Sequence, residues 1–276
     1  MDETHSQRQE RLHSHAILRL EEGGAELRQD LLTVEEPLEV RVRGQAVAVL
    51  MRTPCDDFDL VAGFLHTEGM VQRAQDLGAL SYCSSAQPPN LENIVEVHLT
   101  AGVAFDLEHF RRNLYATSSC GICGKASIEA IRVQAPALGG ELRVRREVLF
   151  GLDEKLRRAQ AVFARTGSLH AAALFDPGGD LLTLREDVGR HNAVDKVVGA
   201  YLRAGSGVPA GLLMVSGRAS FEIVQKALMA GIAMVVAVSA PSTLAVELAR
   251  QSGMTLVGFL RGKVANVYTG AERLVP

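Results

Sequence analysis

The sequence predicts an α/β protein in which a smaller α+β domain precedes a mixed sheet covered by helices. Residues 168–175 and 181–185 are apolar runs joined by Asp176-Pro177-Gly178-Gly179-Asp180, a turn sequence typical of a hairpin. After residue 210, short apolar runs alternate with helical ones, and such a pattern favours parallel strands with right-handed crossovers. Hairpin and parallel strands together indicate a mixed sheet.

The first part of the chain divides into a polar lead-in and a small domain. Residues 1–30 are predicted to be a mobile lead-in, and residues 31–133 form the first domain. Its strand pair lies within residues 38–51, where apolar and polar residues alternate. Asp56 or Asp57 then caps a helix that ends near Gly69. The domain continues with a turn-rich loop over 81–93, a strand over 94–99 and short helices over 107–114 and 126–133.

The second domain is predicted over residues 141–276, after a linker at 134–140 that contains Pro136 and a glycine pair. A strand is expected over 142–150, and the apolar residues between 156 and 163 mark one face of a helix. After the hairpin and a helix around 194–202, the remaining elements are strands over 212–215, 234–238 and 255–259 and helices over 221–230 and 244–250.

Composition predicts a globular protein of a reducing cytoplasm. The chain is 47% apolar, and its 29 basic and 32 acidic residues give a net charge of −3, which does not favour broad nucleic-acid binding. Four cysteines are too few for a disulfide framework in 276 residues. The first fifteen residues lack the apolar core of a signal peptide. The uncharged stretch between Lys226 and Glu247 is interrupted by Gly, Ser and Pro, so we expect no membrane span.

Short polar loops follow three of the predicted strands of the second domain. In an open α/β sheet such loops line the crevice at the carboxyl ends of the strands, where ligands bind. Exposed N–H groups of helix starts and nearby cations favour an anion such as a phosphate. The alternative is that these are ordinary turns with solvated charges. The loops are Ser216-Gly217-Arg218, Ser239-Ala240-Pro241-Ser242 and Leu260-Arg261-Gly262-Lys263.

A second polar stretch runs from Arg185 to Asn192, just before a predicted helix. His191, Asn192 and Asp195 are candidates to reach a ligand. A structural network of salt bridges and caps explains the same residues equally well. The sequence contains neither a P-loop nor a Gly-x-Gly-x-x-Gly motif, so the commonest nucleotide-binding motifs are absent.

The motif Cys120-Gly121-Ile122-Cys123, followed by Gly124-Lys125, has three possible roles. Structural zinc needs two further ligands, which no second Cys-x-x-Cys supplies. A zinc deaminase needs His-x-Glu, and His170-Ala171-Ala172 lacks the glutamate. A thioredoxin-like dithiol normally follows the first strand of a small α/β domain, and this context differs. The third role is a nucleophile whose pKa is lowered by Lys125 and the adjoining helix start, and which carries sulfur as a persulfide.

Six stretches between residues 35 and 270 share the pattern of a known family. They are Ser119 to Gly124, Leu169-His170-Ala171-Ala172-Ala173, Arg185 to Lys196, Ser216 to Ala230, Val238 to Ser242, and Val257 to Gly262. In these stretches the chain resembles the FdhD family of formate dehydrogenase accessory sulfurtransferases. The resemblance implies a cytidine-deaminase-like second domain, with helices on both faces of its sheet.

The resemblance also implies a reaction and its partners. In that family a cysteine desulfurase hands sulfur to the Cys-x-x-Cys loop, which makes Cys120 the persulfide cysteine and Cys123 its partner or a second carrier. The sulfur then passes to Mo-bis(molybdopterin guanine dinucleotide), held as a substrate before its insertion into a molybdenum or tungsten formate dehydrogenase. A homodimer is compatible with this interpretation.

The same resemblance assigns residues 259–264 to the cofactor-binding site, with GDP as the expected mimic. The alternative function is a non-catalytic, zinc-containing chaperone that holds a nucleotide or cofactor. For the sulfurtransferase we expect no resident metal, and neither nucleic acid nor membrane as a partner. The predicted cofactor-binding residues are Phe259, Leu260, Arg261, Gly262, Lys263 and Val264, together with Ser216, Arg218, Ser239, His191 and Asn192.

Overall fold

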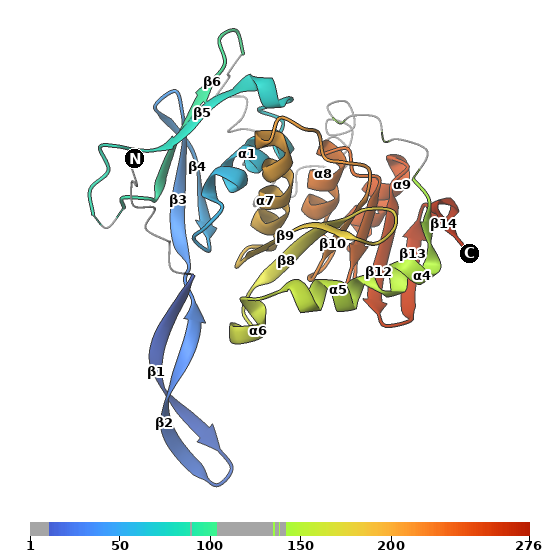
Figure 1. The fold of residues 1–276 in the computed structure, drawn as a ribbon, viewed down its shortest axis with the longest axis horizontal. Coiled ribbons are helices and arrows are strands. Elements are labelled where there is room, and N and C mark those ends of the chain that lie inside the picture. The colour runs from blue at the N-terminus through green and yellow to red at the C-terminus, as the bar shows by residue number, and fades with distance from the viewer. Residues whose placement is uncertain (1–10, 89, 104–134, 136–137, 139–141) are drawn as a thin grey trace, which may run out of the picture.

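The computed structural model describes residues 11–88, 90–103, 135, 138 and 142–276 (Figure 1). The helices predicted over 107–114 and 126–133 lie outside these residues, as do Cys120 and Cys123. Within them the protein has a four-stranded and a six-stranded sheet, and a two-stranded hairpin that projects away from both. No helix of the described part is both long enough and apolar enough to cross a membrane.

The six-stranded sheet is mixed, as the sequence predicts. Its order is β13-β12-β11-β10-β8-β9. The central strands β10, β11 and β12 run parallel to one another, and the other neighbours in the sheet are antiparallel. The strands are β8 (His170–Phe175), β9 (Leu181–Asp187), β10 (Leu212–Val215), β11 (Met234–Ala237), β12 (Thr255–Arg261) and β13 (Val264–Thr269).

Helices cover both faces of this sheet, and the alternation of side chains along each strand explains why. In β10, Leu213 and Val215 pack in the core beneath α7, α8 and α9, whereas Leu212 and Met214 pack in the core beneath α4 and α5. A strand buried on both faces must be apolar throughout. The first layer is α7 (Arg190–Arg203), α8 (Phe221–Met229) and α9 (Thr243–Gln251), and the second is α4 (Arg146–Phe150) and α5 (Leu152–Ala159) (Figure 1).

The smaller sheet has the order β4-β3-β6-β5 and packs against helix α1. Its period-2 pattern buries Leu38, Val40 and Val42 of one strand while their neighbours face outward. The helix buries Leu60, Val61 and Leu65 in the same core. The elements are β3 (Glu36–Val42), β4 (Gln45–Arg52), α1 (Asp57–Thr67), the short 3-10 helix η1 (Ala74–Asp76), β5 (Leu77–Tyr82) and β6 (Ile94–Leu99).

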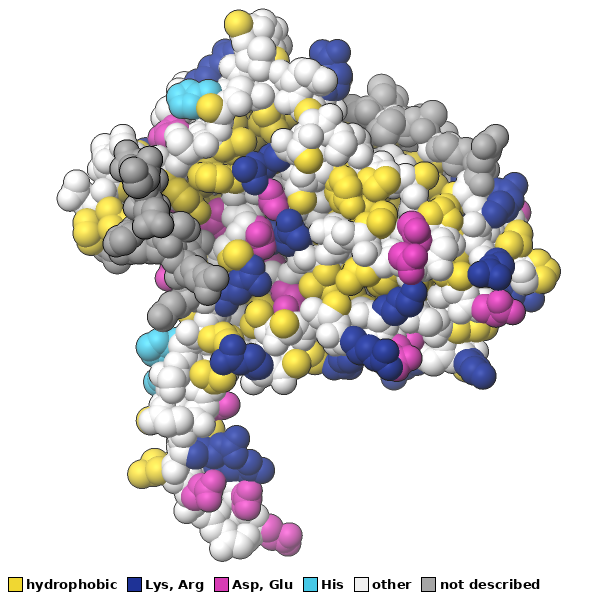
Figure 2. Space-filling view, viewed as in Figure 1, with side chains coloured by type: hydrophobic (Ala, Val, Ile, Leu, Met, Phe, Trp, Pro, Cys, Tyr) yellow, Lys and Arg dark blue, Asp and Glu magenta, His cyan; other side chains and the backbone are white. Residues whose placement is uncertain are grey.

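A β-hairpin occupies most of the stretch that the sequence analysis assigned to a polar lead-in. Its strands are β1 (Leu12–Glu21) and β2 (Gly24–Thr33), paired in register with Leu18 opposite Leu27. We predicted no strands here because charged and histidine residues obscure the period of two. Figure 2 shows apolar and charged side chains interspersed along this projecting hairpin.

The region before the hairpin β8–β9 also differs from the prediction. Only Val144–Arg145 form a strand (β7), which pairs with the C-terminal β14 (Leu274–Val275) after the 3-10 helix η2 (Ala271–Arg273). The single helix predicted over 156–163 is interrupted, because α5 ends at Ala159 and a short helix α6 (Phe163–Thr166) follows. Apolar spacing continues across the break, so periodicity alone could not reveal it.

Helix α1 begins after Asp56 as predicted, but the expected capping contact is absent, and one predicted strand end is wrong. Asp56 precedes α1 in a left-handed conformation, with φ of 55°, and its side chain makes no cap hydrogen bond. It forms an ion pair with Arg11 at 3.2 Å instead. Strand β12 runs past residue 259 to Arg261 and turns at Gly262 into β13, a strand that the prediction lacked. Polar and apolar residues of β13 lie on a half-exposed sheet edge, which weakens its sequence signal.

Helices α1 and α7 cross at unusually close range, and this crossing joins the two sheets. A Cβ atom built on Gly63 would lie 1.8 Å from the Asp195 carbonyl oxygen, and one built on Gly199 would lie 1.8 Å from the Asp59 carbonyl oxygen. Only glycine permits backbones to approach so closely at both positions. Asp59 of α1 also pairs with Arg203 of α7 at 2.6 Å.

Gly199→Ala should therefore destabilise the protein by about 1–3 kcal/mol or more, because the new methyl group overlaps the backbone of α1. The loss should occur even though alanine is the better helix former by ~1 kcal/mol. Gly207→Ala is the matched control, since nothing lies within 4 Å of its Cβ position. The free energy of unfolding in urea measures both variants. Equal stability of the two would show that the crossing is not constrained.

Candidate ligand-binding site

Three loops at one edge of the six-stranded sheet are tied together by backbone hydrogen bonds. The amide of Ala219, after β10, donates to the carbonyl of Ala240, after β11, at 3.2 Å. The amide of Ser242 donates back to Ala219 at 3.1 Å. The amide of Phe259, near the end of β12, donates to the carbonyl of Ser239 at 3.2 Å. The loops that contain Ser216, Ser239 and Arg261 therefore form one continuous edge, as the topology of parallel strands requires.

Helices α7, α8 and α9 all begin at this edge. Ser242 caps α9, because its Oγ accepts a hydrogen bond from the amide of Ala245 at 3.2 Å. Ser220 stands at the same position of α8, but its Oγ makes no cap and lies 3.3 Å from Nε2 of His191. The first amides of α8 thus have no side-chain cap, which leaves the positive end of that helix directed at the edge.

Basic side chains gather at the same edge. Burial lowers the pKa of His170 below its ordinary value of 6.5, and the nearby charges of Arg190 and Arg218 lower it further. The Arg190 Nε is buried and has no hydrogen-bond partner among the described residues. Arg218 is exposed. Together with the helix start, these groups make the edge favourable for an anionic ligand.

A pocket of about 940 Å³ opens beside this edge, on the face covered by α5 and α6. Its volume lies within the range of small-molecule sites. From the sheet it takes Ser216, Leu260 and Arg261, three of the residues that the sequence analysis selected. The same sheet edge contributes His170 and Val238, and the helices contribute Asp153, Glu154, Leu156, Arg157, Arg158, Gln160 and Phe163.

The segment from Phe259 to Val264 is a bulged hairpin rather than a strand-to-helix loop. Phe259 has φ of 54°, a conformation that is strained for an aromatic residue, and keeps 40% of its surface exposed. The following Leu260 is fully buried. The amide of Gly262 donates to the carboxylate of Asp153 at 2.7 Å, so the hairpin turn is held against α5. Lys263 and Val264 lie beyond that turn and are exposed.

His191 and Asn192 lie apart from the large pocket. The Asn192 amide donates to the Met51 carbonyl at 2.7 Å and to Asp187 at 2.9 Å, which ties α7 to β4. His191 Nε2 lies 2.7 Å from the Glu222 carboxylate. Both residues line a smaller cavity of about 180 Å³. The bonding of Asn192 fits the structural explanation of this stretch.

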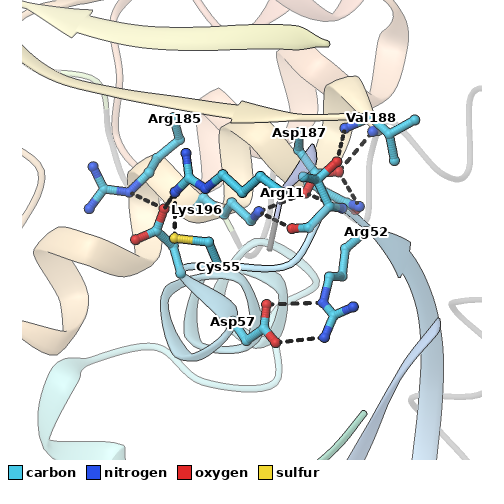
Figure 3. A network of polar contacts seen from close by, with 12 residues as sticks. Arg11, Arg52, Cys55, Asp57, Arg185, Asp187, Val188 and Lys196 are labelled. Atoms are coloured by element: carbon cyan, nitrogen blue, oxygen red, sulfur yellow. Dashed lines mark hydrogen bonds and ion pairs between the residues drawn. The ribbon is translucent and has the colours of Figure 1, made fainter. Parts of the chain in front are cut away.

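Asp187, which accepts a hydrogen bond from Asn192, belongs to a network of largely buried charges (Figure 3). Lys196 pairs with Asp187 at 2.7 Å and donates to the Thr53 carbonyl at 2.9 Å. Arg52 binds Asp57 through two hydrogen bonds, of 3.0 and 2.9 Å. Asp195, which we considered as a ligand contact, is fully buried beside Lys226 at 2.9 Å. In each pair the two charged groups are in direct contact, and Asp195 and Lys226 also line the cavity of about 180 Å³.

Sequence reasoning missed the contribution of α5 to the pocket. Asp153 and Arg157 come from a helix whose charges look like an ordinary solvated face, and Gln160 ends that helix. Nothing in their spacing signals a site, because the pocket forms only when α5 packs across the sheet. Among the described residues, no three His, Cys, Asp or Glu side chains group as metal ligands.

Comparison with known proteins places all these segments in one family. A sequence profile of the FdhD/NarQ family matches residues 33–275, which include both the pocket and the Cys-x-x-Cys motif. The chain belongs to the FdhD/NarQ family. The match begins where the projecting hairpin ends. The part shared with the family therefore includes both sheets and the edge formed by the loops of Ser216, Ser239 and Arg261, called the ligand edge below.

Relatives within FdhD/NarQ cover nearly the whole chain. The "Sulfur carrier protein FdhD" of Streptomyces avermitilis is 51% identical over 265 residues, which are 94% of each chain. The protein of that name from Mycobacterium tuberculosis is 53% identical over 255 residues, 90% of this chain and 92% of the relative. A crystal structure from Desulfotalea psychrophila, described as a candidate formate dehydrogenase accessory protein, superposes with a TM-score of 0.76 at 22% identity. It covers 96% of this chain and 99% of its own, and it supports the fold.

The electrostatics of the edge can be tested through His170. Arg218→Ala should raise the pKa of His170 towards 6.5, because the substitution removes one of the positive charges that oppose its protonation. The pKa of His170 should still remain below 6.5, because burial, the larger cause of its lowering, is unchanged in the variant. Titration of the imidazole signals by NMR measures this. Arg250→Ala, at the far end of α9, is the control and should leave the pKa unchanged. If the pKa of His170 did not change in Arg218→Ala, Arg218 would not be one of the charges that act on this histidine.

Proposed function

We propose that this protein is a sulfurtransferase for formate dehydrogenase, with Cys120 as the carrier of a persulfide. The observation that carries the proposal is the 51–53% identity to relatives named sulfur carrier protein FdhD, combined with the Cys120-Gly121-Ile122-Cys123 motif. The donor is a cysteine desulfurase. The substrate is Mo-bis(molybdopterin guanine dinucleotide), which receives sulfur before a molybdenum or tungsten formate dehydrogenase takes it up. The setting is a reducing cytoplasm, where a reactive thiol persists.

The first step is a thiol exchange that conserves oxidation level. The Cys120 thiolate attacks the terminal sulfur of the donor persulfide, and a new S–S bond forms on Cys120. The S–S bond of the donor breaks, and its cysteine leaves as a thiolate. Lys125 and the two flanking glycines favour this step, since a nearby cation stabilises a thiolate and glycines leave it accessible.

The second step needs two electrons, and the cysteine pair can supply them. The Cys123 thiolate attacks the Sγ atom of Cys120, the S–S bond of the persulfide breaks, and the terminal sulfur leaves as hydrosulfide while Cys120 and Cys123 form a disulfide. Hydrosulfide and a proton then replace an oxygen ligand of the metal, which leaves as water. A thiol reductant returns the disulfide to the dithiol. Cys123 is in this scheme the resolving partner.

The ligand edge supports the choice of substrate. A guanine dinucleotide carries a diphosphate, and the edge combines an uncapped helix start with Arg190, Arg218 and Arg261. The adjoining pocket of about 940 Å³ is large enough for a nucleotide. GDP is therefore the proposed mimic of one half of the cofactor.

Cys120→Ala should abolish both persulfide formation and the delivery of active formate dehydrogenase. Incubation with a cysteine desulfurase and cysteine should add one sulfur atom to the wild type, which intact-mass measurement detects. Cys83→Ala is the control, since Cys83 lies in the loop after β5 and should retain full activity. Cys123→Ala should still gain sulfur but lose part or all of the delivery. Full client activity with Cys120→Ala would refute the proposal, and one zinc per purified chain would favour a zinc-containing chaperone.

A further inference from the structure

Gln160 is the one glutamine that lines the large pocket, and its side-chain amide is unsatisfied. The residue ends α5 and is only 3% exposed. Its Nε2 is buried, yet makes no hydrogen bond within the described part of the chain. The backbone is well bonded by contrast, since the Gln160 carbonyl accepts from the Ala164 amide at 3.1 Å.

An unpaired buried donor is costly to a fold. Leaving such a group without a partner costs the desolvation of its N–H bonds, and most buried polar groups in proteins therefore find a partner. A leucine of similar volume would avoid this cost while keeping the packing. Gln160 itself lines the pocket, so a ligand bound there supplies the missing acceptor once the side chain turns its amide towards it.

The surroundings of Gln160 narrow the class of that ligand. Phe163 adds an aromatic surface to the same pocket, with the guanidinium of Arg157 stacked 4.9 Å from its ring centre. Cationic groups such as Arg261 stand at the sheet side of the pocket, where phosphates are favoured. A neutral amide donor near an aromatic side chain suits the carbonyl oxygen of a planar heterocycle better than a phosphate, which cations hold more strongly.

We propose that Gln160 is a specificity-determining residue that donates from Nε2 to the ring carbonyl of a bound purine base. It selects 6-oxo purines over 6-amino purines, because an amino group at the same place offers a second donor in place of an acceptor. The assignment rests on the proposed function for the presence of a guanine dinucleotide. Beyond that function, the proposal identifies Gln160, at the end of α5, as the residue that recognises the base.

The test compares IDP with ADP, which differ in the base only at the 6-position and the adjoining ring nitrogen. Calorimetry on the full chain should give about tenfold tighter binding of IDP than of ADP, the discrimination expected for one hydrogen bond. Gln160→Leu should bring this ratio close to one. Arg261→Ala should weaken both nucleotides alike and preserve the ratio, because it acts on the phosphates. GDP serves as the reference ligand in each titration.

The Tm of Gln160→Leu distinguishes a role of Gln160 in recognising the base from a role in stabilising the fold. Gln160→Leu removes an unpaired donor, so its Tm without nucleotide should equal or exceed that of the wild type. A lower Tm together with equal losses for IDP and ADP would overturn the proposal, as would an unchanged ratio in the variant. None of these outcomes depends on sulfur transfer. A negative result for Gln160→Leu would therefore not affect the conclusion from Cys120→Ala. A negative result for Cys120→Ala would likewise leave the nucleotide-selectivity test unaffected.

Discussion

The close crossing of α1 and α7 is the constraint on which the rest of the structure depends. Backbone meets backbone at Gly63 and Gly199, so neither helix can rotate or slide without overlap. Because α7 begins at the ligand edge, with Arg190 and His191 in its first turn, the crossing also fixes where those side chains stand. The smaller sheet packs on the other side of α1. The smaller sheet thus helps to hold the start of α7 in place, although none of its described residues lines the large pocket.

Polar groups in the protein fall into two classes that differ in how well they are paired. At the junction between the sheets, Arg52, Lys196 and Lys226 are buried and bonded to carboxylates at 2.7 to 3.2 Å. Burial alone would lower the pKa of Lys226, but the carboxylates of Asp195 and Glu68 raise it above its ordinary range. At the ligand edge, Gln160 and Arg190 each keep a buried nitrogen without a partner among the described residues. Arg185, Ser252 and Arg273 also each keep one buried atom without a hydrogen-bond partner in the described part of the chain, away from the large pocket, so only its position beside the pocket relates Gln160 to a ligand.

Much of the fold follows from the sequence because local patterns and global packing agree. The central strand at 212–215 and the strand at 94–99 have the predicted bounds, since apolar runs with clear turn signals leave few alternatives. The hairpin at 12–33 was missed because it buries little, so its two-residue period is filled with polar side chains. Strand β13 was missed for the same reason. Both errors concern strands that contribute little to a core.

The candidate site was only partly predictable. Ser216, Leu260 and Arg261 follow from topology, because the ends of parallel strands must share an edge. Asn192 comes from a stretch equally rich in polar groups, yet it bonds to the Met51 carbonyl and to Asp187. Sequence cannot separate a capping network from a ligand contact when both need the same side chains. No local sequence pattern marks Gln160 as a site residue. It stands out only in the structure, where its buried Nε2 has no hydrogen-bond acceptor among the described residues.

The central claim is that the sulfur-carrying cysteine and the ligand edge serve one bound substrate. In the proposed reaction the hydrosulfide released from Cys120 replaces a ligand of the metal, so the cysteine pair must lie close to the bound cofactor for the sulfur to reach the metal before it is lost to solvent. The most direct measurement is the rate at which an alkylating reagent modifies Cys120, relative to Cys83, with and without GDP. We predict a slower reaction of Cys120 in saturating GDP, because in the proposed complex the negatively charged diphosphate lies beside the thiol and disfavours its thiolate. An unchanged ratio of the two rates, with GDP shown to be bound, would contradict the account.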